Sequence, residues 1–276
     1  MKFGIATFVT DNGIRPDDLG RALEERGFDS LLLAEHSHIP ASRESPYPGG
    51  GDLPEVYYRT LDPFVALAAA GAVTENLLLG TGIALLMQRD VIHTAKEVAS
   101  LDLLSRGRVL FGVGAGWNRE EMRDHGTDPR TRGALLNEQL AALKQIWTNE
   151  QAEFHGEHID FDPMYSWPKP VQRPHPPILV GGESDAALRR LAAYGDHWLP
   201  RGGTPPEEIE RVRGWLADQG KPDVPVSIFG AGRDPKALEG FASARVDRVA
   251  FMLGTKPYDE TLRKLDELAA LADGFR

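Results

Sequence analysis

Four short segments of the chain contain residue types that could bind a ligand or move a proton. Glu35-His36 brings an imidazole, which can donate a hydrogen bond or transfer a proton near neutral pH. The other three contain glycine, which lets the backbone turn sharply and approach a ligand closely. They are Gly82-Ile83, Gly114-Ala115-Gly116-Trp117 and Gly181-Gly182-Glu183-Ser184. Together they favour proton chemistry beside a large flat or phosphorylated ligand.

His36 is the candidate catalytic residue. It could instead be a structural histidine, but its place at the end of an expected strand favours a pocket. Side chains alternate along a strand, so Glu35 and His36 are expected to face different ways. The remaining histidines considered are expected on loops and facing solvent: His38, His155, His158 and His175.

A metal site is not expected. His36 and His38 form an H-x-H pair, but a site needs three or four ligands. The later strands end in glycine, proline or apolar residues, and no H-E-x-x-H motif occurs.

The segment from Gly181 to Ser184 is suited to a phosphate, because it offers two flexible amides, a hydroxyl and the start of a helix. An ordinary helix cap by Ser184 is equally compatible with it. The glycines at 112–116 follow an apolar strand but do not form a dinucleotide fingerprint, which would need glycine at Trp117 or Arg119. Neither G-x-S-x-G nor G-x-x-x-x-G-K-[ST] is present.

The elements that must position these segments alternate between strand and helix. Strands are expected at 2–9, 30–34, 77–80, 109–113, 178–180, 196–200, 224–229 and 248–253. Helices are expected at 17–26, 62–73, 91–104, 132–148, 185–194, 205–219, 234–244 and 257–272. Eight such units without a break in composition predict an α/β fold, a (β/α)8 TIM barrel in one domain over residues 1–276. Chemistry in such a barrel lies at the carboxyl ends of the strands.

Two long stretches interrupt this pattern. The first follows strand 2 and runs to Thr60, and the second, residues 153–177, precedes strand 5. Both exceed an ordinary connection, and the first is expected to form a lid. At the opposite face, Asp102, Ser105 and Arg108 are expected to form a structural set of hydrogen bonds.

Composition limits the partners. There are 41 acidic against 31 basic residues, a formal net charge of -10, which argues against nucleic acid or an anionic membrane surface. No window reaches the apolar length of a membrane span, and cysteine is absent. We expect a cytoplasmic protein that acts on a small molecule.

In order and spacing, several segments resemble the luciferase-like flavin and deazaflavin oxidoreductases, and more narrowly their coenzyme F420-dependent actinobacterial branch. The resemblance runs from the first strand to about Pro200. It rests on residues 34–36, 79–83, 95–108, 112–117 and 167–178, the last running into Gly181-Gly182.

The resemblance implies hydride transfer between the deazaflavin C5 of F420 and a small organic substrate, in a homodimer. It implies a non-proline cis peptide bond, here Gly82–Ile83, behind the ring of the cofactor, and His36 near the reactive face. Gly114, Ala115, Gly116 and Asn118 would line the cofactor, and Gly181, Gly182, Glu183 and Ser184 would hold its phosphate.

Two positions depart from the family pattern. Glu35 stands where F420 members often carry aspartate. Trp117 stands where the sugar-phosphate dehydrogenase type carries a catalytic glutamate, so a sugar phosphate is not expected as substrate.

Further expectations concern the surroundings of the site. Residues 37–59, with Tyr47, Tyr57 and Tyr58, would form the substrate lid. Some basic residues would meet the acidic tail of F420, chosen from Arg43, Arg59, Arg89, Lys169 and Arg201. Three alternatives remain open: an FMN-dependent luciferase-like monooxygenase, a non-catalytic flavin or deazaflavin carrier, and a cofactor-free isomerase.

Overall fold

The computed structural model describes residues 1–276. Eight parallel strands follow one another in the order β8-β7-β4-β3-β2-β1-β10-β9. Bridges from Trp198 to Val226 and from Arg201 to Phe229 bring the two ends of this sheet together. The result is a barrel, as the sequence predicted. Its strands are β1 (Lys2–Thr7), β2 (Ser30–Leu33), β3 (Leu78–Thr81), β4 (Val109–Val113), β7 (Ile178–Gly181), β8 (His197–Leu199), β9 (Ser227–Ala231) and β10 (Arg248–Leu253).

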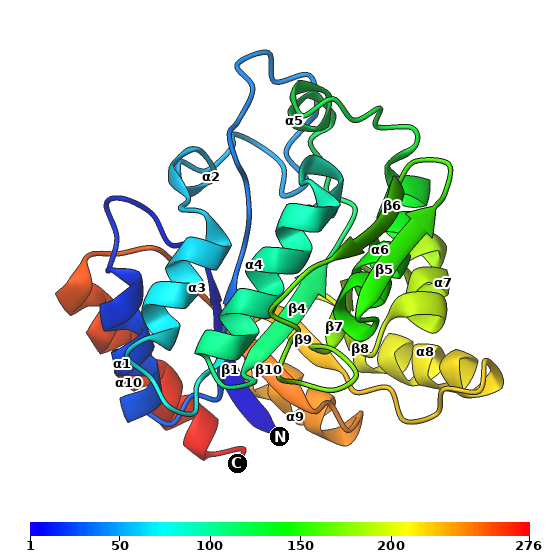
Figure 1. Ribbon diagram of the computed structural model, residues 1–276. Coiled ribbons are helices and arrows are strands. Elements are labelled where there is room, and N and C mark those ends of the chain that lie inside the picture. Colours follow the sequence, from blue (N-terminus) through cyan, green and yellow to red (C-terminus); the bar gives the residue numbers. More distant parts are fainter.

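Helices surround the strands (Figure 1). Seven lie between successive barrel strands in the chain: α1 (Pro16–Glu25), α3 (Pro63–Gly71), α4 (Val91–Leu104), α6 (Arg132–Thr148), α7 (Asp185–Tyr194), α8 (Pro206–Asp218) and α9 (Pro235–Ser243). An eighth, α10 (Tyr258–Asp273), follows the last strand. None of the helices combines the length and the apolarity that crossing a membrane requires.

The strands are buried on both sides because their side chains alternate between two apolar layers. Leu32, Leu110, Leu179 and Leu199 belong to a small cluster that also contains Ala6 and Ala250. Their strand neighbours, such as Leu31, Phe111 and Val180, belong to the larger cluster that includes helix residues. This arrangement leaves strand ends and loops as the places for polar chemistry.

The insertions contain structure that the sequence did not reveal. The stretch after β2 includes a short helix, α2 (Val56–Arg59), and β4 is followed by α5 (Arg119–Asp124). The stretch before β7 folds back as an antiparallel hairpin of β5 (Gln151–His155) and β6 (Asp160–Tyr165). A 3-10 turn, η1 (Leu86–Gln88), follows β3. In Figure 1, α2 and α5 lie at the end of the barrel away from both chain termini.

The predicted structural set at the other end is confirmed. The Arg108 guanidinium donates to the carbonyl oxygens of Gly71, Thr74, Leu77 and Ser105. The fully buried Asp102 carboxylate accepts from the backbone amides of residues 171 and 172, so it fixes the segment that leads into β7.

Candidate active site

A cavity of about 820 Å³ lies where the barrel strands end. Its lining brings together most of the residues selected from the sequence. They are His36, Gly82, Ile83, Gly114, Ala115, Gly116, Gly181, Gly182 and Ser184. Asn118 and Glu183 do not line it. The carboxyl ends of four strands therefore border one cavity, as expected for a (β/α)8 barrel.

Ile83 occupies the floor of this cavity. The Gly82–Ile83 peptide bond is cis, as the resemblance implied. A Cβ atom placed on Gly114 would collide with Cδ1 of Ile83, and one on Gly181 would lie 2.9 Å from its Cγ2. The two glycines are thus needed for close packing around Ile83.

His36 is held by a carboxylate from α5. Its Nδ1 lies 2.8 Å from Oε2 of Glu121, and Oε1 of the same residue accepts from the Ser37 amide at 3.1 Å. Glu121 is fully buried, and His36 is nearly so. Nε2 of His36 has no hydrogen-bond partner in the protein, so this nitrogen is left for a ligand.

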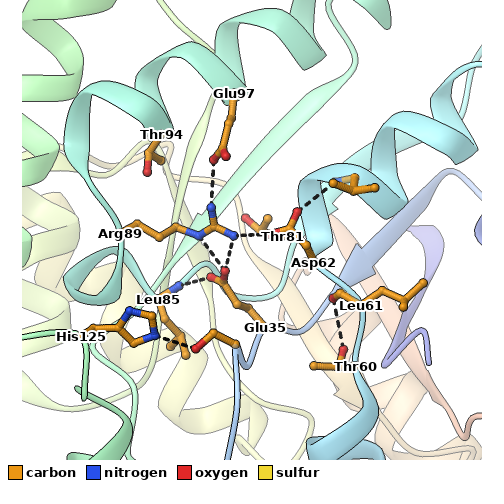
Figure 2. Close-up of polar contacts among 12 residues, drawn as sticks. Glu35, Thr60, Leu61, Asp62, Thr81, Leu85, Arg89, Thr94, Glu97 and His125 are labelled. Atoms are coloured by element: carbon orange, nitrogen blue, oxygen red, sulfur yellow. Dashed lines mark hydrogen bonds and ion pairs between the residues drawn. The ribbon is translucent and has the colours of Figure 1, made fainter. Parts of the chain in front are cut away.

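Glu35 faces a different set of partners, as alternation predicted (Figure 2). Its Oε2 accepts from the Leu85 amide and its Oε1 accepts from Nε of Arg89, each at 2.6 Å. Arg89 also pairs with Asp62 at 2.7 Å and Glu97 at 2.9 Å. These carboxylates raise the pKa of Arg89 despite its burial. Glu35 therefore anchors β2 to the segment after β3.

Aromatic rings enclose His36. Its ring centre lies 5.1 Å from that of Tyr57 and 5.8 Å from that of Trp117. Tyr47 packs edge-on against both of these rings, and Phe8 lies 4.7 Å from Tyr57. Burial raises the pKa of Tyr57, and the neighbouring phenol of Tyr47 adds to the effect. The rings that pack around His36 are therefore apolar, and the Tyr57 phenol stays uncharged at neutral pH.

The predicted lid is attached to α5 at several points. Ser45 donates from its amide to Glu120 at 2.7 Å. Asp124 lies 3.0 Å from Nε2 of His38, and Arg123 pairs with Glu44. Tyr47 and Tyr57 line the cavity, whereas Tyr58 is 52% exposed and does not. Two of the three expected lid tyrosines therefore reach the site.

The basic rim was expected to include some of five residues, and one of the five lines the cavity. Arg201 lines the cavity, but Arg43, Arg59, Arg89 and Lys169 do not. Arg59 pairs with Asp11, Arg89 with the carboxylates described above, and Lys169 donates to a backbone carbonyl. The position of these basic residues in the sequence does not show which carboxylates or carbonyl groups they meet in the fold.

Three arginines outside the expected set also line the cavity: Arg130, Arg132 and Arg190. Arg190 is buried and donates to Asn137 and the Gly133 carbonyl, but it forms no ion pair with a carboxylate. Burial without such a partner lowers its pKa. Arg130, in contrast, is exposed and held by Asp128.

Two helix N-termini open on the same region. Ser184 caps α7, with its Oγ accepting from the Ala187 amide at 3.3 Å. No side chain caps α6, and its residues Arg132 and Gly133 line the cavity. Backbone amides at helix starts and an uncompensated guanidinium both attract anions. These groups together would favour an anion such as a phosphate or a carboxylate at this part of the cavity.

Three other residues take places that the sequence did not indicate. Asn118 caps α5 by accepting from the Glu121 amide at 3.2 Å. Glu183 accepts from the amide and guanidinium of Arg201. The expectation that His175 faces solvent is wrong, because it is buried against Trp147 with its Nδ1 near the Pro176 carbonyl.

Sequence reasoning missed Glu121, Arg132 and Arg190 as site residues. Glu121 is an acidic residue in the first turn of α5. Its position one turn after a strand-end loop could have suggested proximity to His36. Arg190 lies in the second turn of α7, the helix that begins directly after the segment Gly181 to Ser184. Its position one to two turns from that segment could have indicated that it reaches the site.

Strands that end at one large cavity, with a histidine fixed there by a buried carboxylate, define a (β/α)8-barrel enzyme. The chain belongs to the luciferase-like monooxygenase family, whose model matches residues 14–270. It is an enzyme of the luciferase-like oxidoreductase and monooxygenase class.

Similar proteins include an uncharacterized protein of Mycobacterium tuberculosis, 38% identical over 98% of both chains. The FMNH(2)-dependent dimethylsulfone monooxygenase of Pseudomonas putida is 32% identical over 65% of this chain and 45% of its own length. The F420-dependent hydroxymycolic acid dehydrogenase of M. tuberculosis is 26% identical over 71% of this chain and 52% of its own. The structure of an F420-dependent secondary alcohol dehydrogenase with an F420-acetone adduct covers both chains completely, with a TM-score of 0.76 and 17% identity.

Proposed function

We propose that the protein is an F420-dependent oxidoreductase that acts on a small organic substrate through hydride transfer at the deazaflavin C5. The observation that carries this proposal is the shape of one cavity. It has a close-packed floor at Ile83, a histidine on its wall and an anion-binding end at the starts of α6 and α7. A flat ring with a phosphorylated side chain matches these three features.

The residues fit the cofactor. The side chains missing at Gly82, Gly114 and Gly181 leave the floor free, and a Cβ at any of them would meet a neighbouring atom. Gly182, with φ of 102°, has a backbone conformation that other residues rarely adopt. Gly182, Ser184 and Arg190 would hold the phosphate.

When bound, F420 would supply a hydride donor or acceptor at C5. The chain itself would orient the substrate and manage the proton. His36 would accept or donate a proton at Nε2, the ring nitrogen without a protein partner. The aromatic rings of Tyr47, Tyr57 and Trp117 would exclude water around it.

The wall around His36 also limits the substrate. Glu35 is the only acidic residue of the lining, and Arg89 neutralises it. The basic residues lie at the other end. The reacting part of the substrate is therefore expected to be uncharged and apolar, with one oxygen able to bond to His36.

An FMN-dependent monooxygenase is the second candidate. It is favoured by the likeness to the dimethylsulfone monooxygenase, and the same cavity suits the ring and phosphate of FMN. In that case reduced FMN and oxygen would replace F420 as reactants.

One pair of assays separates these functions. Purified protein is mixed without oxygen with F420 or reduced F420 and a panel of neutral alcohols or ketones, and F420 absorbance is followed. Oxygen consumption with reduced FMN is measured in parallel. Substrate-dependent change of F420 absorbance supports the proposal. Substrate-dependent oxygen uptake with reduced FMN, and none with F420, would replace it by the monooxygenase.

A further inference from the structure

Glu121 is an unusual carboxylate for its position. It is completely shielded from solvent, and a buried carboxylate is costly unless it is paired and hydrogen-bonded. No lysine or arginine pairs with it. Its one ionisable partner is His36, at 2.8 Å.

The two carboxylate oxygens of Glu121 have different hydrogen-bond partners. Oε1 accepts from the Ser37 amide, which can only donate. Oε2 faces Nδ1 of His36, and an ionised carboxylate can only accept, so Nδ1 carries the proton. In neutral His36 the other nitrogen, Nε2, is then unprotonated and faces no protein partner.

We propose that Glu121 is a positioning residue that fixes the Nδ1-protonated tautomer of His36 and so presents Nε2 to the substrate as a proton acceptor. The role of Glu121 in turnover rests on the proposed function, whereas its effect on the tautomer does not. Ser37 is the first residue of the lid, so the same carboxylate joins the orientation of His36 to the anchored lid.

The neighbouring Glu120 provides a matched control. It lies on the same helix, is 4% exposed, and is hydrogen-bonded. Its partner is Ser45 rather than His36. Loss of charge at Glu120 should therefore disturb the lid and leave His36 unchanged.

The tautomer can be read by ¹⁵N NMR of the imidazole in the full-length, ligand-free protein, at a pH well above the ordinary histidine pKa of about 6.5. In wild type, Nδ1 is expected to be protonated and Nε2 bare. In Glu121→Gln the Ser37 amide requires the carboxamide oxygen, so the NH₂ group must donate to Nδ1 and the proton moves to Nε2. Glu120→Gln and Glu121→Asp should keep the wild-type pattern.

Kinetics supply a second readout, with whichever cofactor supports turnover. Glu121→Gln should lower kcat by about 100-fold or more, the usual worth of a positioned proton-transfer group, while the Kd of the cofactor stays within about threefold. Glu121→Asp, which keeps the charge, should recover part of kcat.

An unchanged His36 tautomer in Glu121→Gln would overturn the proposal, as would equal effects of Glu120→Gln and Glu121→Gln on the tautomer. Because the NMR experiment contains no cofactor, a shifted tautomer in a protein that fails to bind F420 would reject the proposed function and keep this inference.

Discussion

Glu35 and His36 are adjacent in sequence and have unrelated partners at the site. The Glu35 carboxylate is occupied by Arg89 and the Leu85 amide, whereas His36 keeps one nitrogen free. This difference follows from the alternation of side chains at a strand end. Only His36 is therefore available for proton chemistry.

Replacing His36 by Ala should lower kcat by about 10² to 10⁴, because a positioned acid or base contributes that much. Cofactor affinity should change little, because the residues proposed to hold the cofactor phosphate are Gly182, Ser184 and Arg190 rather than His36. Steady-state kinetics and a cofactor titration of the same preparation measure both quantities. Unchanged turnover in this variant would remove His36 from the mechanism.

The sequence allowed His36 and the glycine segments to be selected, because residue type and position at a strand end suffice for that. It did not allow the choice among arginines. Arg89 and Arg190 both lie near strand ends in the chain, but Arg89 meets carboxylates from three segments and Arg190 meets none. Which charges remain uncompensated depends on long-range packing.

At the scale of elements, the floor of the site depends on backbones that approach one another closely. Ile83, after β3, packs between Gly114, after β4, and Gly181, at the end of β7. The contact positions three neighbouring strand ends relative to the cavity. This contact involves no polar group, so its contribution to stability comes from van der Waals packing.

Gly114→Ala should force Ile83 to move and destabilise the fold by about 1–3 kcal/mol, the usual cost of overpacking. Weaker cofactor binding should accompany this loss. Urea unfolding and cofactor titration measure the two effects.

Gly214→Ala is the control, because Gly214 lies inside α8 with open space around it. This substitution should instead stabilise the protein by about 0.5–1 kcal/mol, since alanine favours helix. Equal stability changes in the two variants would contradict the role given to Ile83.

The elements themselves were largely predictable. The boundaries of β4, α4, α6, α7 and β10 agree with the sequence pattern. Apolar runs mark the strands, and side-chain caps at Asp90 and Ser184 mark the starts of α4 and α7. The segments α2 and β5–β6 were not assigned, and for α5 the acidic residues Glu120 and Glu121 indicated a helix start but not its length. They are short and rest on tertiary contacts, such as those between Ser45 and Glu120, rather than on a periodic pattern.

At the scale of the whole molecule, a polar cluster links β8, β9 and β10 to Asp29, the residue before β2. His197 bonds through Nε2 to Ser227 Oγ at 2.8 Å, and Arg248 joins Ser227 to Asp29. Burial, with the nearby Arg248 charge, lowers the pKa of His197 to about 4. The fold therefore holds this histidine neutral.

Unfolding should become easier as pH falls from about 6.5 to about 4. In that window the unfolded chain binds a proton at His197 and the folded chain does not, so acidification favours unfolding, by up to about 3 kcal/mol. Above pH 6.5 the full stability is present. Urea midpoints measured across this range should fall more steeply for wild type than for His197→Gln.

His155→Gln, at an exposed position, is the control. In this variant the urea midpoint should fall with decreasing pH as steeply as in wild type. Parallel curves for wild type and His197→Gln would show that the buried cluster does not set the acid sensitivity.

The central claim, that the barrel binds F420, is tested most directly by equilibrium titration of the purified protein with F420 and with FMN, following cofactor fluorescence. The account predicts tighter binding of F420 than of FMN. Tight binding of FMN with weak binding of F420 would contradict it and assign the cavity to a flavin.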